Sequence, residues 1–444
     1  MKTFRLLPLI AAVSAALAVP AHAQSLVNLY ESARGFDASY QSAKSQYDAT
    51  LARADQAKAA ILPTANLAVG ASRSKQEVTP EGLPGSERSY GTRSATISAS
   101  QPLYRPANWA SYEQGLKQID LAQAQLAAAD QDLIVRVSQG YFDVLAAIDN
   151  LTFVKAQKAA VAEQLASAKR NFEVGTSTIT DTREAQARYD LVIAQEIAAE
   201  NDLRVKRIAL GQLVGKNNAE PQALALPLQL PALQPSDVNT WVAQSEAEHP
   251  VIRQTQVALD VAQLETQKAR AGHLPTLDLT ASYSTISNLE GSSTPGSGSS
   301  RVNAGNLGLS LNVPLFAGFS TQNRIRETLA LEDKARNDLE GAKRSVAQAT
   351  RTAYFGVLSG QGQVNALQAA EASSQSALDA NKLGYQVGVR INIDVLNSQS
   401  QLFDTKAKLA KARYDVLLGG LKLRQASGTL KADDLQSVNV LLLK

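Results

Sequence analysis

Residues 274–283, LPTLDLTASY, carry the two signals from which the fold follows. From Leu277 onward, apolar residues alternate with small or polar ones, and Leu307–Val313 repeats this alternation. Both segments are therefore predicted to be β-strands with one apolar face. The second signal is the triplet Leu274-Pro275-Thr276, which also occurs as Leu62-Pro63-Thr64, 212 positions earlier. The chain therefore contains a repeated unit.

The repetition extends over most of the chain at an offset of 212 or 213 positions. Matches at a nearly constant offset over such a length indicate a tandem duplication. The matching pairs are Pro102-Leu103-Tyr104 with Pro314-Leu315-Phe316, Tyr141-Phe142 with Tyr354-Phe355, Val174-Gly175 with Val387-Gly388, Asp181 with Asp394, and Gly215 with Gly428.

The duplication divides the chain into five predicted segments. Each copy is expected to consist of a helix, two strands, a very long helix and a further helix, and the prolines between the copies prevent a continuous helix there. The segments are a signal peptide at 1–23, a first copy at 24–215, a Pro-rich linker at 216–237, a second copy at 238–428 and a tail at 429–444.

Composition excludes several classes of protein. Hydrophobic residues make up 44% of the 444 residues, too many for a disordered chain. The net charge is only +3, from 44 basic and 41 acidic residues, which argues against a nucleic-acid partner. Without cysteine, the chain has no disulfide, thiolate nucleophile or Cys-ligated metal.

The N-terminus has the features of a secretory signal peptide. Lys2 and Arg5 precede the apolar run Leu6–Val19, and Ala21-His22-Ala23 fits a cleavage site before Gln24. Fourteen apolar residues fall short of the roughly 20 that span a bilayer as a helix. We expect export without a lipid anchor, because no cysteine follows the cleavage site.

Two strands are predicted in each copy. Leu67, Val69 and Ala71 begin a weaker version of the alternation in the first copy, which Ile97 and Ala99 continue. Polar segments rich in Gly and Pro, at 74–90 and 287–301, are predicted to be long hairpin loops. A soluble sheet half buried on a core gives the same alternation, so the pattern alone leaves the environment of the sheet open.

The helices follow a different period. Apolar residues between Val137 and Leu151 step by four and three positions, a spacing typical of coiled coils. After Pro106 no proline occurs as far as Phe172, so the 68 residues Arg105–Phe172 predict a helix of roughly 100 Å at about 1.5 Å per residue. Gly318–Tyr385 repeats that length.

Two shorter helices are expected to stack end to end beside each long one. In the first copy, Leu26–Ile61 has 36 residues and Thr180–Leu213 has 34, which together nearly equal the long helix. Their junction would then lie halfway along it, and the linker and the tail would form a belt at that level.

Four strands per chain bear on the oligomeric state. The smallest outer-membrane barrels need eight strands, and an open sheet in lipid would leave unpaired backbone groups that cost several kcal/mol each. Two chains would supply eight strands and a filled interior, whereas three would supply twelve strands and room for a pore, continuous with a cylinder of helices.

The sequence resembles the TolC family of outer-membrane efflux and secretion ducts over nearly all of residues 24–435. In the second copy the resemblance rests on YQVGVRINIDVL at 385–396, ARY at 412–414 and ASGTL at 426–430. In the first copy it rests on FEVG at 172–175, ITD at 179–181 and AQARYD at 185–190.

The resemblance implies a membrane α+β fold, in which a homotrimer forms a 12-stranded β-barrel continuous with a coiled-coil α-helical barrel. The barrel would sit in the lipid of the outer membrane of a Gram-negative bacterium, and the helices would extend into the periplasm. Expected partners are a periplasmic adaptor protein and an inner-membrane transporter of the ABC, RND or MFS type, with no nucleic acid. The duct would carry cargo of a tripartite efflux pump or a type I secretion system.

The resemblance also implies a gate at the periplasmic tip. Gly175 and Gly388 fit the C′ positions of the two tip turns. Thr180 and Asp181 would face Tyr385 and Arg390, and these links would hold the entrance closed. Asp181 also fits an N-terminal cap, with Glu184 at capping-box spacing, and this structural role remains an alternative.

Asp394 is the candidate for an acidic constriction ring, because three copies of it would bind cations around the axis. The family often has a second Asp one turn later, where this chain has Asn397, and the ring is weaker for it. Lys382 stands where an acidic partner for Gln164 would be expected, so that link is not expected here.

No enzymatic site emerges from the sequence. Neither His249 nor His273 has a nearby Glu or His at metal-ligand spacing, so we expect no catalytic residue, metal or cofactor. The rival to the duct is a non-conducting periplasmic coiled-coil tether with a soluble sheet. A passive tunnel has no substrate pocket, so the sequence does not identify the cargo.

Overall fold

The computed structural model describes residues 24–79, 81–82, 86–216, 219–225, 230–291 and 298–443, so the expected signal peptide lies outside the described residues. The described residues divide into two compact units. The helical unit lies within Met1–Lys44, Gln125–Ile252 and Lys343–Lys444, and the sheet unit comprises Ser45–Ala124 and Arg253–Ala342.

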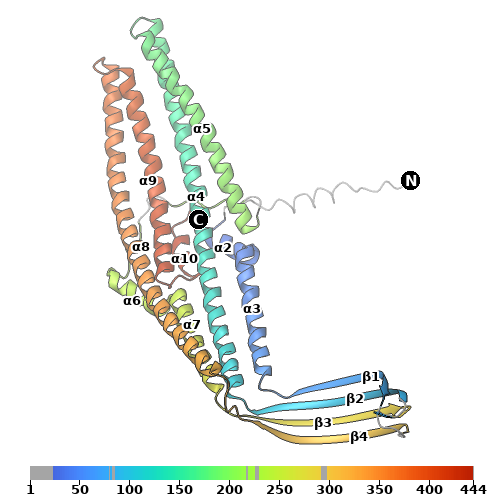
Figure 1. The fold of residues 1–444 in the computed structure, drawn as a ribbon. Helices are drawn as coiled ribbons and strands as arrows, with labels where there is room; N and C mark the ends of the chain where they lie inside the picture. The colour runs from blue at the N-terminus through green and yellow to red at the C-terminus, as the bar shows by residue number, and fades with distance from the viewer. Residues whose placement is uncertain are drawn as a thin grey trace, which may run out of the picture. The chain divides into compact units, whose positions relative to one another are not determined.

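The sheet unit contains one antiparallel sheet with the strand order β1-β2-β3-β4 (Figure 1). This confirms the two strands predicted in each copy. The strands are β1, Thr64–Val78, β2, Ser86–Tyr104, β3, Thr276–Leu289, and β4, Ser300–Asn312.

The two faces of the sheet differ in chemistry, as the alternation predicts. Leu67 pairs with Ile97, Ile97 with Tyr283 and Tyr283 with Gly305, so odd-numbered residues of all four strands share one face. We call the apolar part of this face the apolar band. Its members are Ala65, Leu67, Val69, Ala95, Ile97, Ala99, Leu277, Leu279, Ala281, Tyr283, Leu307, Leu309 and Leu311.

The opposite face of the same part of the sheet is rich in hydroxyl and amide side chains. Its one ionisable group among the described residues of this region is Asp278. Arg105 Nε and Nη2 lie 2.8 and 2.5 Å from the two oxygens of Asp278, which balances its charge. The polar residues are Thr64, Asn66, Ser72, Ser94, Thr96, Ser98, Ser100, Thr280, Ser282, Ser284, Asn306, Ser310 and Asn312.

The predicted hairpin loops at 74–90 and 287–301 are wrong in extent. The strands run on into both segments, with Val78 opposite Ser86 in the first hairpin and Asn288 opposite Ser300 in the second. Cross-strand polar pairs extend the first ladder, because Lys75 forms an ion pair with Glu87. The polar composition of these segments was interpreted as a loop, but it belongs to the ends of the paired strands.

The two long helices match the predicted length of 68 residues to within one residue. Helix α4, Pro106–Glu173, has 68 residues, and α8, Ser320–Gln386, has 67. Pro106 occupies the first position of α4, where its missing N–H costs no hydrogen bond. No helix in the described part of the chain combines the length and apolar character needed to cross a membrane.

The first helix of each copy is broken, which corrects the continuous helix predicted at 26–61. In the first copy α2, Leu26–Phe36, ends at Asp37 and α3, Ala38–Ala59, follows. In the second, α6, Val238–Glu248, ends at His249 and α7, Pro250–Ala271, follows. Asp37 and His249 both have extended backbones and stand 212 positions apart.

Different contacts stabilise the two breaks. Arg136 donates two hydrogen bonds, of 2.9 and 3.0 Å, to the Asp37 carboxylate. These bonds hold the pKa of Asp37 below its usual value. Burial lowers the pKa of His249, whose Nδ1 accepts a hydrogen bond from the N–H of Val251 at 3.2 Å.

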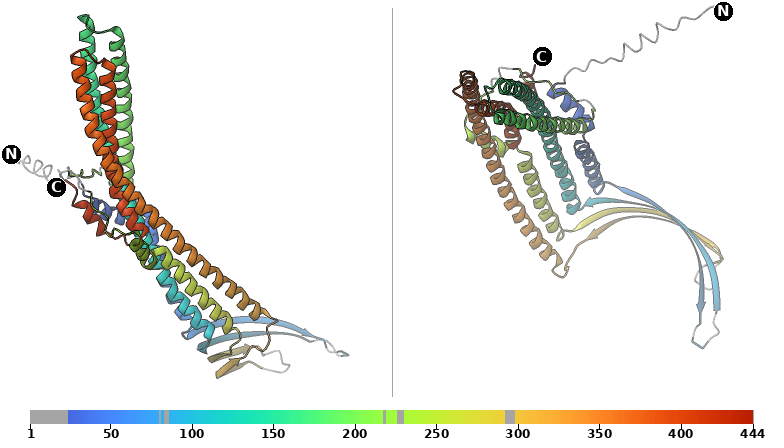
Figure 2. Two further views of the ribbon diagram at one scale, coloured as in Figure 1. Left: turned by 90° about the vertical axis from the view of Figure 1, so that its left-hand side faces the viewer. Right: turned by 90° about the horizontal axis from the view of Figure 1, so that it is seen from above.

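The helical unit contains the C-terminal portions of α4 and α8, together with α5, Ile179–Val214, and α9, Asn392–Ala426 (Figure 2). A short helix, α10, Asp434–Asn439, lies in the tail. The core of this unit joins both copies, since Phe142 of α4 stacks on Tyr414 of α9 with ring centroids 5.8 Å apart. Its most buried members include Leu133, Ile134, Val137, Tyr141, Val144, Leu210 and Leu435.

The linker and the tail are fastened to the middle of the long helices. Tyr141 of α4 donates a 2.7 Å hydrogen bond to the carbonyl of Gln222, and its counterpart Tyr354 of α8 donates to the carbonyl of Ser236. Leu224 of the linker forms an antiparallel bridge with Leu442 of the tail. Equivalent tyrosines of the two copies thus each hold one part of the linker.

Candidate functional site

The two tip turns join α4 to α5 and α8 to α9 within the helical unit. Gly175 and Gly388 adopt φ values of +77° and +80°, the left-handed conformation expected of C′ glycines. The N–H of Thr176 closes the first turn on the carbonyl of Asn171 at 2.8 Å, and that of Val389 closes the second on Gly384 at 2.9 Å. Apolar side chains around both turns are exposed, namely Val174, Ile179, Val387, Val389 and Ile391.

Asp181 caps its own helix. The helix α5 begins at Ile179, with Thr178 as its N-cap, so Asp181 stands at the third position and forms a capping box with Thr178. This corrects the predicted box between Asp181 and Glu184, which would require the helix to begin three residues later. The carboxylate accepts hydrogen bonds from the hydroxyls of Ser177 and Thr178, at 2.7 and 2.8 Å, and from the Thr178 N–H at 3.0 Å.

The same hydrogen bonds set the charge state of Asp181. Partial burial disfavours its ionised form, but the bonds from Ser177 and Thr178 outweigh burial and lower the pKa of Asp181 below its usual value. Asp181 is therefore a satisfied carboxylate within one chain, and it remains charged at neutral pH.

The structure does not bring the predicted latch residues into contact within one chain. Tyr385 Oη accepts a hydrogen bond from Asn171 at 3.2 Å, and Arg390 Nη1 lies 3.6 Å from Asp394 Oδ2. The stem of Arg390 packs on Gly384, where a β-carbon would come within 2.6 Å of Arg390 Cγ. Thr180 is exposed, and none of its described neighbours forms a side-chain hydrogen bond with it.

The two residues proposed for the constriction ring both have partners. Asp394 is one-third exposed and forms the ion pair with Arg390 described above. Asn397 is exposed and accepts a 2.9 Å hydrogen bond from Arg188 of α5. Each ring position is therefore next to a guanidinium group, which reduces the negative potential there.

Sequence reasoning missed the polar link between the two tip hairpins. Asn392, at the start of α9, is fully buried; its Oδ1 accepts from Gln164 of α4, and its Nδ2 donates to the carbonyl of Asp181 at 3.2 Å. Beside it, Leu396 packs among apolar residues of α4 and α5. A polar residue among the apolar positions of 391–396 was the available signal, but its partner lies 228 positions away.

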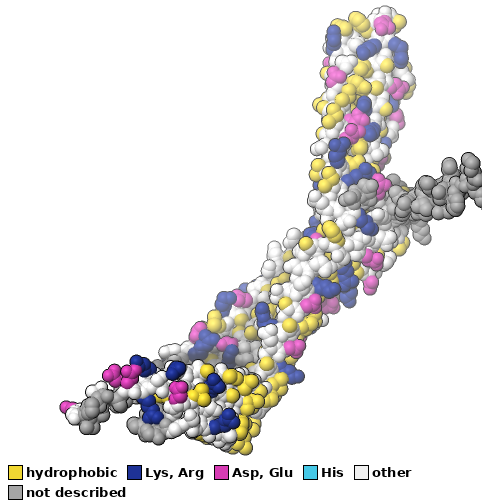
Figure 3. Space-filling view, turned by 90° about the vertical axis from the view of Figure 1, so that its right-hand side faces the viewer, with side chains coloured by type: hydrophobic (Ala, Val, Ile, Leu, Met, Phe, Trp, Pro, Cys, Tyr) yellow, Lys and Arg dark blue, Asp and Glu magenta, His cyan; other side chains and the backbone are white. Residues whose placement is uncertain are grey.

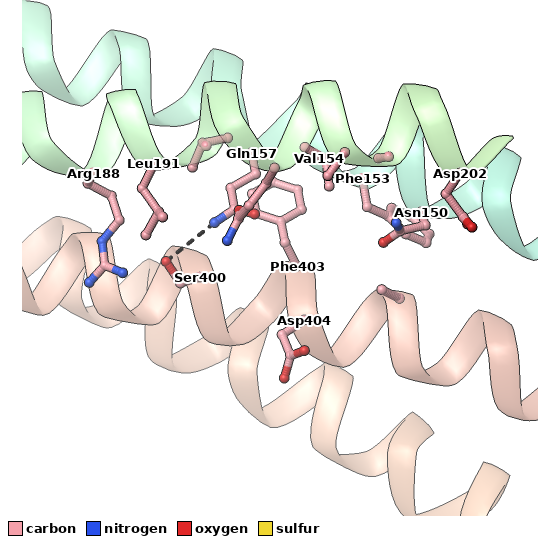
Figure 4. Close-up of a pocket in the computed structure, with 15 residues that line it drawn as sticks. Asn150, Phe153, Val154, Gln157, Arg188, Leu191, Asp202, Ser400, Phe403 and Asp404 are labelled. Atoms are coloured by element: carbon pink, nitrogen blue, oxygen red, sulfur yellow. Dashed lines mark hydrogen bonds between the residues drawn. The ribbon is translucent and has the colours of Figure 1, made fainter. Parts of the chain in front are cut away.

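A groove of about 590 Å³ runs between α4, α5 and α9 in the helical unit (Figure 4). Gln157 of α4 reaches across it to Ser400 of α9, with Nε2 3.4 Å from Oγ (Figure 4). Its lining combines apolar with charged groups, which suits a partly polar helix or loop of a partner. Among the lining residues are Phe153, Arg188, Leu191, Asp202, Phe403 and Asp404.

No metal centre accompanies these features in the described part of the chain, where His, Asp and Glu residues nowhere form a group of three fit to hold an ion. His249 lies at the α6–α7 break, and His273 follows the end of α7.

Comparison with known proteins relates the whole chain to outer-membrane channels. A family model described as outer membrane efflux protein matches residues 29–216 and 241–429. Outer membrane protein TolC of Vibrio cholerae serotype O1 is 34% identical over 436 residues, which cover 98% of each chain. The alkaline protease secretion protein AprF of Pseudomonas aeruginosa is 31% identical, over 94% of this chain and 87% of that protein.

Solved structures agree at the level of the fold. The CmeC outer membrane channel of Campylobacter jejuni superimposes with a TM-score of 0.77 at 16% identity. The superposition covers 94% of this chain and 90% of that one. The sheet of four strands and the paired helical hairpins are therefore the fold of this group of channels.

Proposed function

The chain belongs to the outer membrane efflux protein family, and from this premise we propose how it works as an exit duct of efflux or type I secretion. Proteins of this family are trimeric channels and not enzymes. They lie in the outer membrane of Gram-negative bacteria and extend into the periplasm. The proposal concerns the gate at the helical tip, the constriction and the partners.

The observation that carries the duct is the sheet with two unlike faces and two free edges. The apolar band suits contact with lipid, and the hydroxyl-rich face suits a water-filled lumen. Strands β1 and β4 form the edges, and their outer backbone groups need partners in a bilayer, where each unsatisfied group costs several kcal/mol. Three chains joined edge to edge provide these partners and close a ring of twelve strands.

The gate is assigned to contacts between chains at the tip. Within one chain Asp181 is held by its own cap, and among the described residues Asp394 is the one charged partner of Arg390. Both groups are partly exposed and carry opposite charges, which supports an Arg390–Asp181 contact between neighbouring chains, with Tyr385 and Thr180 beside it. An exposed pair contributes only about 0 to 1 kcal/mol, so a docking partner can release it.

The constriction ring is assigned to Asp394, with Asn397 one turn further into the duct. Three Asp394 carboxylates would attract cations, but the neighbouring Arg390 offsets each charge. Asn397 is neutral, and its Oδ1 accepts a hydrogen bond from Arg188. The second position therefore adds no negative charge to the ring. We therefore propose a weakly cation-binding ring.

The partners are assigned to the exposed tip turns and to the groove further along the same helices. Five apolar side chains around the two turns are 48–76% exposed, and the groove of about 590 Å³ between α4, α5 and α9 has a lining of apolar and charged groups. These features support docking of a periplasmic adaptor, which would connect the duct to an inner-membrane transporter of the ABC, RND or MFS type. Cargo selection then belongs to the transporter.

Membrane fractionation and bilayer recording test the proposal together. We expect a heat-resistant trimer in the outer-membrane fraction and single-channel currents when the purified trimer is added to a planar bilayer. Release of the protein by osmotic shock, with no currents from the purified protein, would instead establish the tether.

A further inference from the structure

Arginines continue the lipid-facing side of the sheet beyond the apolar band. Arg93 of β2 pairs with Ala71 of β1 and with Ser287 of β3, and Ser287 pairs with Arg301 of β4. The register between these positions and the Ile97–Tyr283 pair is unbroken, since the one shift in the β2–β3 ladder lies at Pro102/Tyr104. Arg93, Ser287 and Arg301 therefore share the face of the apolar band, and we call them the arginine row.

The position along the strand places this row at the border of the membrane. Ten residues separate Leu277, at the inner end of the apolar band, from Ser287. At about 3.4 Å per residue and a tilt of roughly 35–45°, that span rises about 25 Å, the height of the apolar belt of outer-membrane barrels. Figure 3 shows basic side chains on the sheet beyond its hydrophobic part, toward the hairpin end.

The basic groups of the row are not neutralised by the sheet itself. Arg93 is exposed and has no hydrogen bond or ion pair with any described residue. Arg301 is exposed, and among the described residues it donates only from Nε, to the Ser287 hydroxyl at 3.3 Å, so neither Nη group has a partner among them. Lipid-facing arginines are costly at the bilayer centre but not at its border, where they reach the headgroups.

Two acidic groups near the row are paired with other cations, and Glu77 stands six residues beyond Ala71, the partner of Arg93. Glu290 lies 3.5 Å from Arg73, and Glu87 forms its ion pair with Lys75. A hollow of about 320 Å³ is lined by Arg73, Arg93 and Glu290. Arg301 does not line it, because it lies on β4, two strands away from Arg93 on β2. The excess positive charge is therefore concentrated at Arg93 and Arg301.

We propose that the arginine row binds the phosphate groups of lipids in the outer leaflet, and that each trimer carries three such sites around its membrane belt. A guanidinium fork matches phosphate oxygens in pairs, and Ser287 between the two arginines offers a hydroxyl. A lipid is the occupant because the row is continuous with the apolar band, which holds the acyl chains of the same molecule. The inference rests on the sheet being the membrane part of the proposed duct.

Native mass spectrometry of the detergent-solubilised trimer tests the site, with diphosphorylated lipid A as the probe. We compare wild type with Arg93→Gln/Arg301→Gln and with the control Arg88→Gln, which removes a charge from the opposite face of the same strand. The double variant is expected to bind lipid A about thirtyfold more weakly, and the control to bind as wild type does. Dephosphorylated lipid A is expected to bind wild type and the double variant alike.

Three results would overturn the site: equal affinity of wild type and the double variant, an equal loss in Arg88→Gln, or displacement of lipid A by inorganic phosphate at equal concentration. The last would identify a site for soluble anions. Currents of the same preparations in planar bilayers separate this test from that of the duct. Normal currents with unchanged lipid binding refute the lipid site alone, whereas a wild-type trimer without currents refutes the duct.

Discussion

Gly428 lies directly against the backbone of His249. A β-carbon at position 428 would come within 2.5 Å of the His249 Cα and 2.8 Å of its N atom. In the first copy the equivalent Gly215 lies against the ring of Phe36, with 2.6 Å between the corresponding atoms. The glycine that ends the returning helix thus contacts the break in the first helix in both copies.

This contact predicts unequal effects of alanine at the two glycines. Gly428→Ala should lower the free energy of unfolding by about 2–4 kcal/mol, because the cost of a positive φ adds to the cost of a collision with the backbone. Gly215→Ala should cost less, since the Phe36 ring is 59% exposed and can move. Urea midpoints of the detergent-solubilised trimers measure both values, and Gly420→Ala, in open space, is the control.

Acid should loosen the break of the second copy first. Protonated Nδ1 of His249 cannot accept the Val251 N–H, and burial already disfavours the charged ring. Because the pKa of His249 is lower when folded, the unfolded chain binds the extra proton, and stability falls as the pH drops below about 6.5. Hydrogen exchange of residues 245–252, corrected for intrinsic rates, should therefore rise between about pH 7 and pH 5.

The break at Asp37 is the internal control for this measurement. The folded pKa of Asp37 is lower than its unfolded value near 3.9, so its contribution is present above about pH 4 and is lost only as the pH falls through the folded value. Equal protection of residues 245–252 at both pH values would contradict the role of His249, and His249→Gln should abolish the pH response.

Removal of the latch groups should open the tip. Arg390→Ala combined with Tyr385→Phe is expected to raise the single-channel conductance in planar bilayers, because the contacts proposed between chains are lost. Lys382→Ala removes a charge from the same end of α8 and should leave the conductance unchanged. Conductance of the double variant at the wild-type level would refute the latch.

Block by a trivalent cation tests the constriction ring. Asp394→Asn should weaken block roughly fivefold, corresponding to about 1 kcal/mol of electrostatic attraction. Asn397→Asp alone should add little, because Arg188 already contacts that side chain, whereas Asn397→Asp with Arg188→Gln should strengthen block. If Asp394→Asn left the blocking concentration unaltered, the ring would have to be placed elsewhere.

The buried link between the tip hairpins should contribute measurably to stability. Asn392→Ala leaves Gln164 and the Asp181 carbonyl without their partner, at a cost of about 1–3 kcal/mol. A double-mutant cycle with Gln164→Ala should show coupling, while Asn381→Ala, which removes a bond within one hairpin, should show none with Gln164. Strictly additive urea midpoints for Asn392 and Gln164 would argue against the link.

Regular features of the fold were predictable because they recur with a period. The absence of proline from 107 to Phe172 predicted the length of α4 almost to the residue, and alternation predicted both strands of the second copy. The break at Asp37 escaped prediction because no proline marks it. It depends on Arg136, 99 positions away, and on the Asp37 side chain, which accepts from the Tyr40 N–H at 2.8 Å.

The tip could be located from the sequence, but its pairing could not. Two glycines with the same spacing to the following acidic residue identified the turns. The contacts of Asn392 and Asn397 join residues more than 200 positions apart, on faces fixed by how two hairpins pack. Asp181 was misassigned for a local reason, since the N-cap is Thr178, three residues before the predicted cap at Asp181.

The hydroxyl-rich face of the sheet has a consequence for movement. Its serines, threonines and asparagines stand at even-numbered positions of all four strands, at every second residue over 94–100 of β2 and 280–284 of β3, and its one ionisable group there among the described residues is held by Arg105. A polypeptide passing such a wall exchanges each weak hydrogen bond for an equivalent one a few ångströms further on. No step of the passage is then much deeper than its neighbours, so the wall offers low friction without offering a resting place.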